Sequence, residues 1–127
     1  TSKQGVIALS KAISLVGKYW FFLSVLLLLS VSFLSLSPNE ELPEVAGSDK
    51  THHLIAYALL AFPTALRRPN GWRYIILFFA IYSGVIEVIQ PYVNRYGEWT
   101  DFTANLAGLL IGSIIALISS FGISGKP

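Results

Sequence analysis

The sequence contains no cysteine and few charged residues. The absence of cysteine excludes disulfide bonds, thiolate metal ligands and cysteine nucleophiles in these 127 residues. Only 13% of the residues are charged, whereas about a quarter are charged in a typical soluble domain. The formal net charge of +2 is too small to predict nucleic acid as a partner. The chain is instead rich in apolar residues, with 54% hydrophobic residues and a mean hydropathy of +0.62, and this composition predicts a membrane protein.

Four apolar stretches predict an all-α membrane protein, a four-span antiparallel transmembrane helix bundle. A helix that crosses a hydrocarbon core of about 30 Å needs roughly 20 residues. We expect the spans at about residues 19–36, 52–66, 72–89 and 102–121. The length of the chain is that of one domain, which we place at residues 1–127.

The residues before the first span follow a helical pattern of their own. Val6, Leu9, Ile13 and Val16 recur at helical spacing, and lysines occupy another side. This pattern predicts an N-terminal interfacial amphipathic helix, with its lysines toward anionic headgroups. The alternative is a flexible cytoplasmic leader.

Basic residues mark one side of the predicted bundle. They lie before the first span, between the second and third spans, and after the fourth: Lys3, Lys11, Lys18, Arg67, Arg68, Arg73 and Lys126. Because lysine and arginine concentrate on the cytoplasmic side of membrane proteins, we expect a multi-pass protein with both termini in the cytoplasm. The Arg67–Arg73 turn faces the cytoplasm in the same topology.

The other ends of the second, third and fourth spans carry polar residues. They are Asp49, Lys50, His53 and Tyr57, then Glu87 and Gln90, and then Asp101 and Asn105, with Arg95 in the turn between the last two spans. Ionisable groups at membrane depth are expensive and mark functional sites. Residues three or four positions apart share a helix face, so the sequence predicts a polar pocket that opens to the outer leaflet. Gly108 and Gly112 would let the fourth span pack closely beneath it.

Within this pocket we assign acid–base catalytic roles to His53, Glu87 and Asp101. The residues assigned to substrate binding are Asp49, Lys50, Tyr57, Gln90, Arg95 and Asn105. Structural alternatives remain open for several of these residues. Glu87 could form an ion pair that fixes helix register, Asp101 could cap a helix, and Gln90 and Asn105 could form hydrogen bonds between helices.

Two motifs in this region resemble the signatures of the VanZ-like family. The segment DKTHHLIAYALL resembles the family pattern Asp/Glu-Lys-x-x-His-x-x-x-Tyr. The segment IEVIQPYVNRYGEWTDFTANLAGLLIG resembles the second pattern, Glu-x-x-Gln, then Arg, then Asp-x-x-x-Asn-x-x-Gly. The resemblance assigns family positions to Asp49, Lys50, His53, Tyr57, Glu87, Gln90, Arg95, Asp101, Asn105, Gly108 and Gly112. It implies a location in the bacterial cytoplasmic (inner) membrane, and the family takes its name from a member linked to teicoplanin resistance.

The sequence departs from the family in the turn before the fourth span. Tyr96 and Trp99 are bulky where many members are small and rich in serine. This difference predicts a change in what the pocket accommodates.

The residues of the pocket fit a phosphate-bearing lipid or a cell-wall precursor as the ligand. Lys50 and Arg95 would neutralise phosphate, while His53 with Glu87 or Asp101 would supply acid–base groups. Prenyl-phosphate carriers and phospholipids belong to the same ligand class. The alternative is a non-enzymatic accessory subunit that docks on a larger membrane complex through the small residues of the fourth span, with the polar residues serving helix packing.

The sequence predicts no cofactor and assigns no residue to a metal site, although a metal site stays open as a third possibility. His52, His53, Glu87 and Asp101 carry metal-ligating atoms, but adjacent histidines on a helix point about 100° apart and seldom bind one ion. A channel or transporter is also disfavoured, because the polar residues occupy only the outer half of the predicted bundle.

Overall fold

The computed structural model describes residues 3–36, 49–93 and 99–124 of the chain. The helices are α1 (Lys3–Lys18), α2 (Trp20–Leu36), α3 (Asp49–Arg67), α4 (Trp72–Ile89), the short 3₁₀ helix η2 (Gln90–Val93) and α5 (Trp99–Ser124). These ranges contain no strand, which confirms the all-α prediction. The third predicted span, residues 72–89, has the same bounds as α4.

Glycine and proline determine where α3 and α4 end. Pro69, Asn70 and Gly71 separate the two helices, and Gly71 has a φ of 77°, a left-handed conformation that glycine adopts without strain. Pro91 follows α4, and the chain continues as η2 because proline has no N–H for the α-helical hydrogen bond. The turn at residues 68–71 therefore directs the chain from α3 back along α4.

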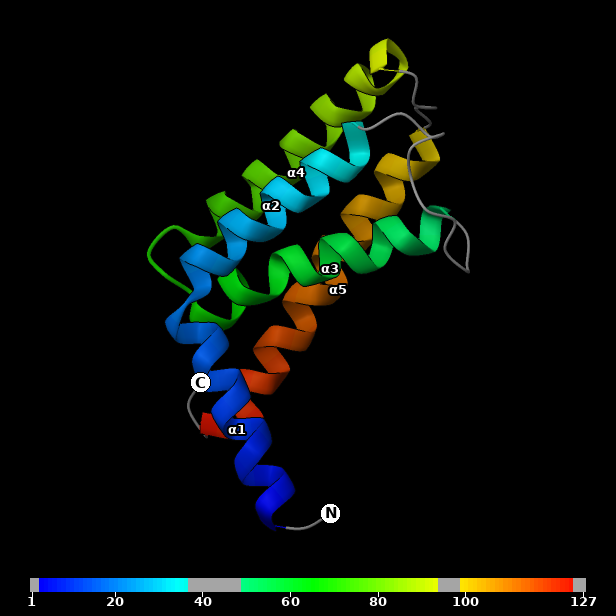
Figure 1. The fold of residues 1–127 in the computed structure, drawn as a ribbon. Coiled ribbons are helices and arrows are strands. Elements are labelled where there is room, and N and C mark those ends of the chain that lie inside the picture. The colour runs from blue at the N-terminus through cyan, green and yellow to red at the C-terminus, as the bar shows by residue number, and fades with distance from the viewer. Residues whose placement is uncertain (1–2, 37–48, 94–98, 125–127) are drawn as a thin grey trace.

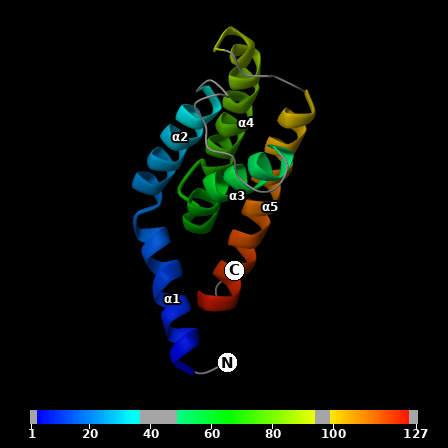
Figure 2. The same ribbon diagram turned by 45° about the vertical axis from the view of Figure 1, so that its right-hand side comes forward.

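The central helix of the structure is α3, which contacts α1, α2, α4 and α5. Its most extensive contact is with α5. In Figures 1 and 2, α2 and α4 lie side by side, and α3 runs obliquely between this pair and α5. Residues on different faces of α3 consequently contact each of the other α-helices.

The interior of the described structure combines an apolar core with many polar side chains, and the exposed surface is apolar. Buried polar residues are Ser24, Ser35, Thr64, Ser83, Glu87, Gln90, Asp101, Asn105 and Ser113. Exposed apolar side chains cover α2, α4 and α5, including Phe33 at 71%, Val88 at 59% and Ile118 at 65% exposure. Soluble domains seldom expose such continuous apolar surface, so lipid is the solvent that this surface fits.

Two helices, α4 and the Thr100–Ser120 part of α5, are long and apolar enough to cross a membrane. A third crossing is reached if α1 and α2, which meet at a bend of 79°, form one broken span. Alone, α2 has 17 residues, and α3 begins with the polar sequence DKTHH. The structure thus indicates a membrane protein with two or three spans by length and composition, and the count of four spans stays a prediction.

The N-terminal helix α1 contains no buried residue. Its partly buried Ile13 and Val16 pack against Ala65 and Leu66 of α3. The contact holds α1 beside the end of α3, and the predicted interfacial position of α1 remains a prediction.

The two ends of the structure differ in what they carry. In Figure 1 the N- and C-terminal labels lie at the lower end with α1, while α2 and α4 end, and α5 begins, at the upper end. Arg68, directly after α3, donates a hydrogen bond of 3.0 Å from Nη2 to Ser120 Oγ of α5. The polar residues of the predicted pocket lie toward the upper end.

Candidate functional site

Three helices bring His53, Glu87 and Asp101 together. These residues come from α3, α4 and α5, and each contributes one ligand-type atom to a group whose members all lie within 4.8 Å of one another. Glu87 and Asp101 are buried, each with 6% of its surface exposed. We call these three residues the His–Glu–Asp cluster. The cluster therefore unites the three residues to which the sequence analysis assigned acid–base roles.

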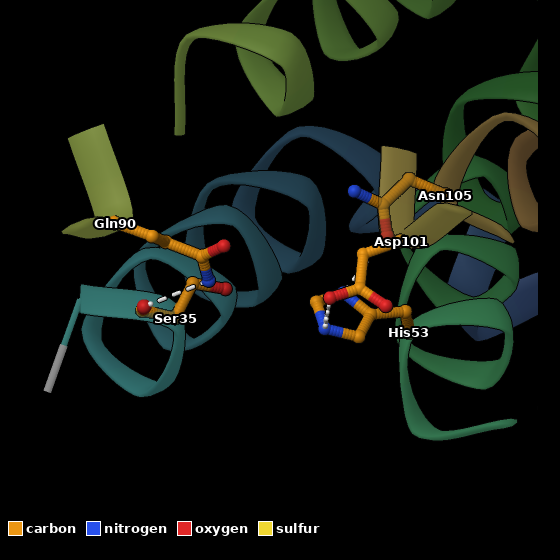
Figure 3. A network of polar contacts seen from close by, with 5 residues as sticks. All are labelled: Ser35, His53, Gln90, Asp101 and Asn105. Atoms are coloured by element: carbon orange, nitrogen blue, oxygen red, sulfur yellow. Dashed lines mark hydrogen bonds and ion pairs between the residues drawn. The ribbon is translucent and has the colours of Figure 1, made fainter. Parts of the chain in front are cut away.

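One turn of α5 contacts both nitrogens of the His53 ring (Figure 3). His53 Nδ1 lies 2.9 Å from Asn105 Oδ1, and His53 Nε2 lies 4.0 Å from Asp101 Oδ2. An amide oxygen can only accept a hydrogen bond, so Nδ1 carries the proton and donates it. Nε2, the other ring nitrogen, faces the Asp101 carboxylate, and in the neutral imidazole it is the nitrogen that carries the lone pair. The imidazole is thereby oriented as a base or as a ligand.

Three buried polar atoms beside the cluster have no hydrogen-bond partner in the described part of the chain. They are Tyr57 OH, Gln90 Oε1 and Asn105 Nδ2, on residues that are each 1% exposed. The other end of the Gln90 amide is held, because Nε2 donates to the Ser35 carbonyl at 3.1 Å. A buried polar atom without a partner costs about 1–3 kcal/mol. A bound ligand or ordered water would remove that cost.

Glycines allow α5 to approach α3 directly below this region. A Cβ atom added at Gly108 would lie 3.1 Å from Ala58 N and would also meet Leu54 O. One added at Gly112 would lie 2.7 Å from Ala58 Cα and would also meet Ala58 O. Both positions face the backbone of α3, so only glycine fits at this separation of the helices. The approach places Asp101 and Asn105 beside His53.

Several predicted site residues cannot be located relative to the cluster. Arg95 and Tyr96 lie outside the described residues. Asp49 and Lys50 begin α3, but their side chains lie outside the described part of the chain, as does that of Trp99. The role of Lys50 and Arg95 in binding phosphate therefore stays a prediction.

The adjacent histidines on α3 differ in position. His53 is part of the cluster and His52 is not. Tyr57, one turn after His53, lies within Coulombic range of Glu87. The face of α3 that carries His53 and Tyr57 is thus the face directed at the site.

The contribution of α2 to the site was missed from the sequence. The Ser35 carbonyl accepts the hydrogen bond from Gln90. Ser24 Oγ also lies 3.2 Å from Thr64 Oγ1 between α2 and α3, but about three helical turns from His53 along α3. A hydrogen bond to a backbone carbonyl cannot be predicted from residue type, because every residue has such a carbonyl. The spacing of Ser24 and Ser35, about three helical turns, was the signal that one face of α2 is polar.

The comparisons with known proteins support the family resemblance. The profile of a family described as VanZ/LLP1 matches residues 7–120. This match includes all the described residues of the cluster and the helices that position them. Comparison with curated proteins and with solved structures gave no match.

Proposed function

The chain belongs to the VanZ/LLP1 family, and from that premise we propose that it binds or processes a phosphate-bearing lipid or a cell-wall precursor. The protein would act in the bacterial cytoplasmic membrane, with its polar site open to the outer leaflet. The observation that carries the proposal is a cluster of acid–base residues beside three buried polar atoms that lack partners, inside a protein with an apolar surface.

The chemistry of the site fits an acceptor-rich headgroup. Tyr57 OH and Asn105 Nδ2 are donors without a partner among the described residues, and phosphate oxygens are strong acceptors. His53 Nε2 can take a proton from an attacking hydroxyl or water. Glu87 and Asp101 would assist as acid–base partners or orient the substrate, and Lys50 and Arg95 would neutralise the phosphate.

The proposed topology places this site at the outer leaflet. We take α2, α3, α4 and α5 as four spans and α1 as a helix at the cytoplasmic interface. Apart from Lys50 at the start of α3, the basic residues of the described ranges lie on α1 and in the Arg67–Arg73 segment, and such residues favour the cytoplasmic side. The Asp49, Gln90 and Asp101 ends of the spans then face outward.

Native mass spectrometry of gently solubilised protein tests this function. We expect the wild-type chain to carry a phosphorus-containing lipid, and His53→Ala and Glu87→Gln to lose it while remaining folded. Ser113→Ala is the matched control, because Ser113 is buried on α5 and donates to its own helix at Leu109 O. A wild-type chain without any specific lipid, or equal lipid retention in all variants, would refute the proposal.

The alternative role as an accessory subunit has less support. That role used the small residues of the fourth span as a docking face, but Gly108 and Gly112 pack against α3 of the same chain. A partner protein would have to bind another surface. Copurification of partner subunits with a lipid-free wild-type chain would support the accessory-subunit role in place of the proposed function.

A further inference from the structure

We propose that the His–Glu–Asp cluster binds one divalent first-row metal ion, Mn²⁺ or Zn²⁺. The ligands are Nε2 of His53 and one carboxylate oxygen each from Glu87 and Asp101. The site is defined by residues of this chain alone, and its existence does not depend on the lipid. The cluster is buried among three helices, so an ion held there would also connect α3, α4 and α5.

The distances of the cluster suit an ion at its centre. Its three ligand atoms lie within 4.8 Å of one another, and Nε2 of His53 lies 4.0 Å from Oδ2 of Asp101. Nitrogen and oxygen ligands bind Zn²⁺ at about 2.0–2.2 Å, so two ligands of a tetrahedral ion lie about 3.4 Å apart. The separation of 4.0 Å is too long for a direct hydrogen bond. A small side-chain movement would close it around an ion.

Asn105 prepares the histidine as a ligand. Metal-binding histidines usually donate their other ring N–H to an oxygen atom, which fixes the tautomer and the orientation of the ring. His53 Nδ1 makes such a bond to Asn105 Oδ1 at 2.9 Å. Nε2 therefore faces the side where Asp101 lies (Figure 3), and it can ligate an ion there through the lone pair of the neutral imidazole.

A second observation also indicates a ligand at this place. Gln90 Oε1 and Asn105 Nδ2 are buried and lack partners among the described residues. In the view of Figure 3, the Gln90 oxygen points toward the side of the bundle that carries His53 and Asp101. These atoms are suitable partners for waters or for a substrate bound to the ion.

The donor set selects the kind of metal. One imidazole nitrogen with two carboxylate oxygens is a mixed set that suits Mn²⁺ or Zn²⁺, whereas Ca²⁺ and Mg²⁺ prefer oxygen alone. Three protein ligands leave at least one coordination position open, as in catalytic rather than structural zinc sites. The sequence analysis assigned no metal site because adjacent histidines diverge, but this cluster requires only His53.

An ion in this position would make Nε2 of His53 a ligand in place of the base proposed above, and it would give the site a way to bind phosphate. Metal ions polarise phosphoryl oxygens and orient them for displacement. Phosphate as the occupant of the open position rests on the proposed function. Metal binding by the three side chains does not.

Metal titration of the 127-residue chain tests the inference. The purified protein, stripped with EDTA and exchanged into phosphate-free detergent buffer, is titrated with Mn²⁺ by electron paramagnetic resonance and with Zn²⁺ by calorimetry. We expect one ion per chain in the wild type, and loss of binding in His53→Ala, Glu87→Gln and Asp101→Asn. His52→Ala is the matched control and keeps the ion, because His52 is adjacent to His53 but outside the cluster.

The Asn105→Ala variant separates orientation of His53 from ligation. It retains one ion per chain but binds it about 10–100-fold more weakly, the usual effect of removing a group that orients a metal ligand. The inference is overturned if the wild type binds neither ion saturably, or if Glu87→Gln and Asp101→Asn bind as well as the wild type.

Lipid analysis of the same samples distinguishes the two proposals. A phosphorus-containing lipid on stripped wild-type protein that takes up no metal would leave the proposed function standing and refute the metal site. Saturable metal binding in protein without any specific lipid would support the metal site and refute the proposed function.

Discussion

Gln90 illustrates how one side chain serves both the fold and the site. Its Nε2 donates to the carbonyl of Ser35, near the end of α2, and its Oε1 remains without a partner among the described residues. The last four carbonyls of a helix have no partner within that helix. Gln90 Nε2 therefore gives one terminal carbonyl of α2 its hydrogen bond, while Gln90 Oε1 remains an acceptor on the side of the His–Glu–Asp cluster.

Replacing Gln90 with leucine should destabilise the protein. Gln90→Leu keeps the approximate volume but leaves the Ser35 carbonyl without its donor, and an unsatisfied buried group costs about 1–3 kcal/mol. We expect a lower free energy of unfolding in a detergent titration. Tyr92→Phe, a change at a side chain that is 86% exposed, is the control and should unfold with the wild type. Equal stability of Gln90→Leu and wild type would show that this hydrogen bond contributes nothing.

The residues of the cluster were predictable because helical spacing determines which side chains share a face. His53 with Tyr57, and Asp101 with Asn105, lie four positions apart, and the structure turns both pairs inward. The sequence did not predict which partner each nitrogen of His53 would contact. That choice depends on the rotation of α5 against α3, which results from packing rather than from residue type.

The contact between α3 and α5 depends on the absence of side chains at two positions. At Gly108 and Gly112 an added Cβ would meet backbone atoms of α3, and backbone cannot move aside as a flexible side chain can. In lipid such close packing, rather than the hydrophobic effect, holds helices together. The position of the cluster follows from this contact, since Asp101 and Asn105 precede the glycines on α5.

Alanine at either glycine should therefore weaken both stability and the site. We expect Gly108→Ala and Gly112→Ala each to lower the free energy of unfolding by about 1–3 kcal/mol, the usual effect of overpacking. Gly84→Ala is the matched control, because the nearest atoms to a Cβ there belong to the Phe102 ring, at 3.3 Å, and a side chain can shift where backbone cannot. The measurement is unfolding of the three variants in the same detergent. Wild-type stability of both α5 variants would contradict the close approach.

The order of the helices was predictable, but the central place of α3 was not. Apolar runs and the breaks at Pro69–Gly71 and Pro91 located the helices to within a few residues. The oblique course of α3, in contact with every other α-helix, depends on long-range packing against Ala58 and its neighbours. The composition also did not determine how many helices cross the membrane, because α2 has only 17 residues and α3 begins with polar ones.

The absence of cysteine makes the proposed topology directly testable, because any cysteine introduced into the chain is the only one. Thr51 and Asn70 are exposed and lie near the start of α3 and just beyond its end, and Thr100 is exposed near the start of α5. If α3 and α4 both cross the membrane, Thr51→Cys and Thr100→Cys should react with a membrane-impermeant maleimide added outside spheroplasts. Asn70→Cys should react only after the membrane is opened. Labelling of Thr51→Cys and Asn70→Cys from the same side would mean that α3 does not cross the membrane. The proposed opening of the cluster to the outer leaflet would then require a different arrangement of the helices.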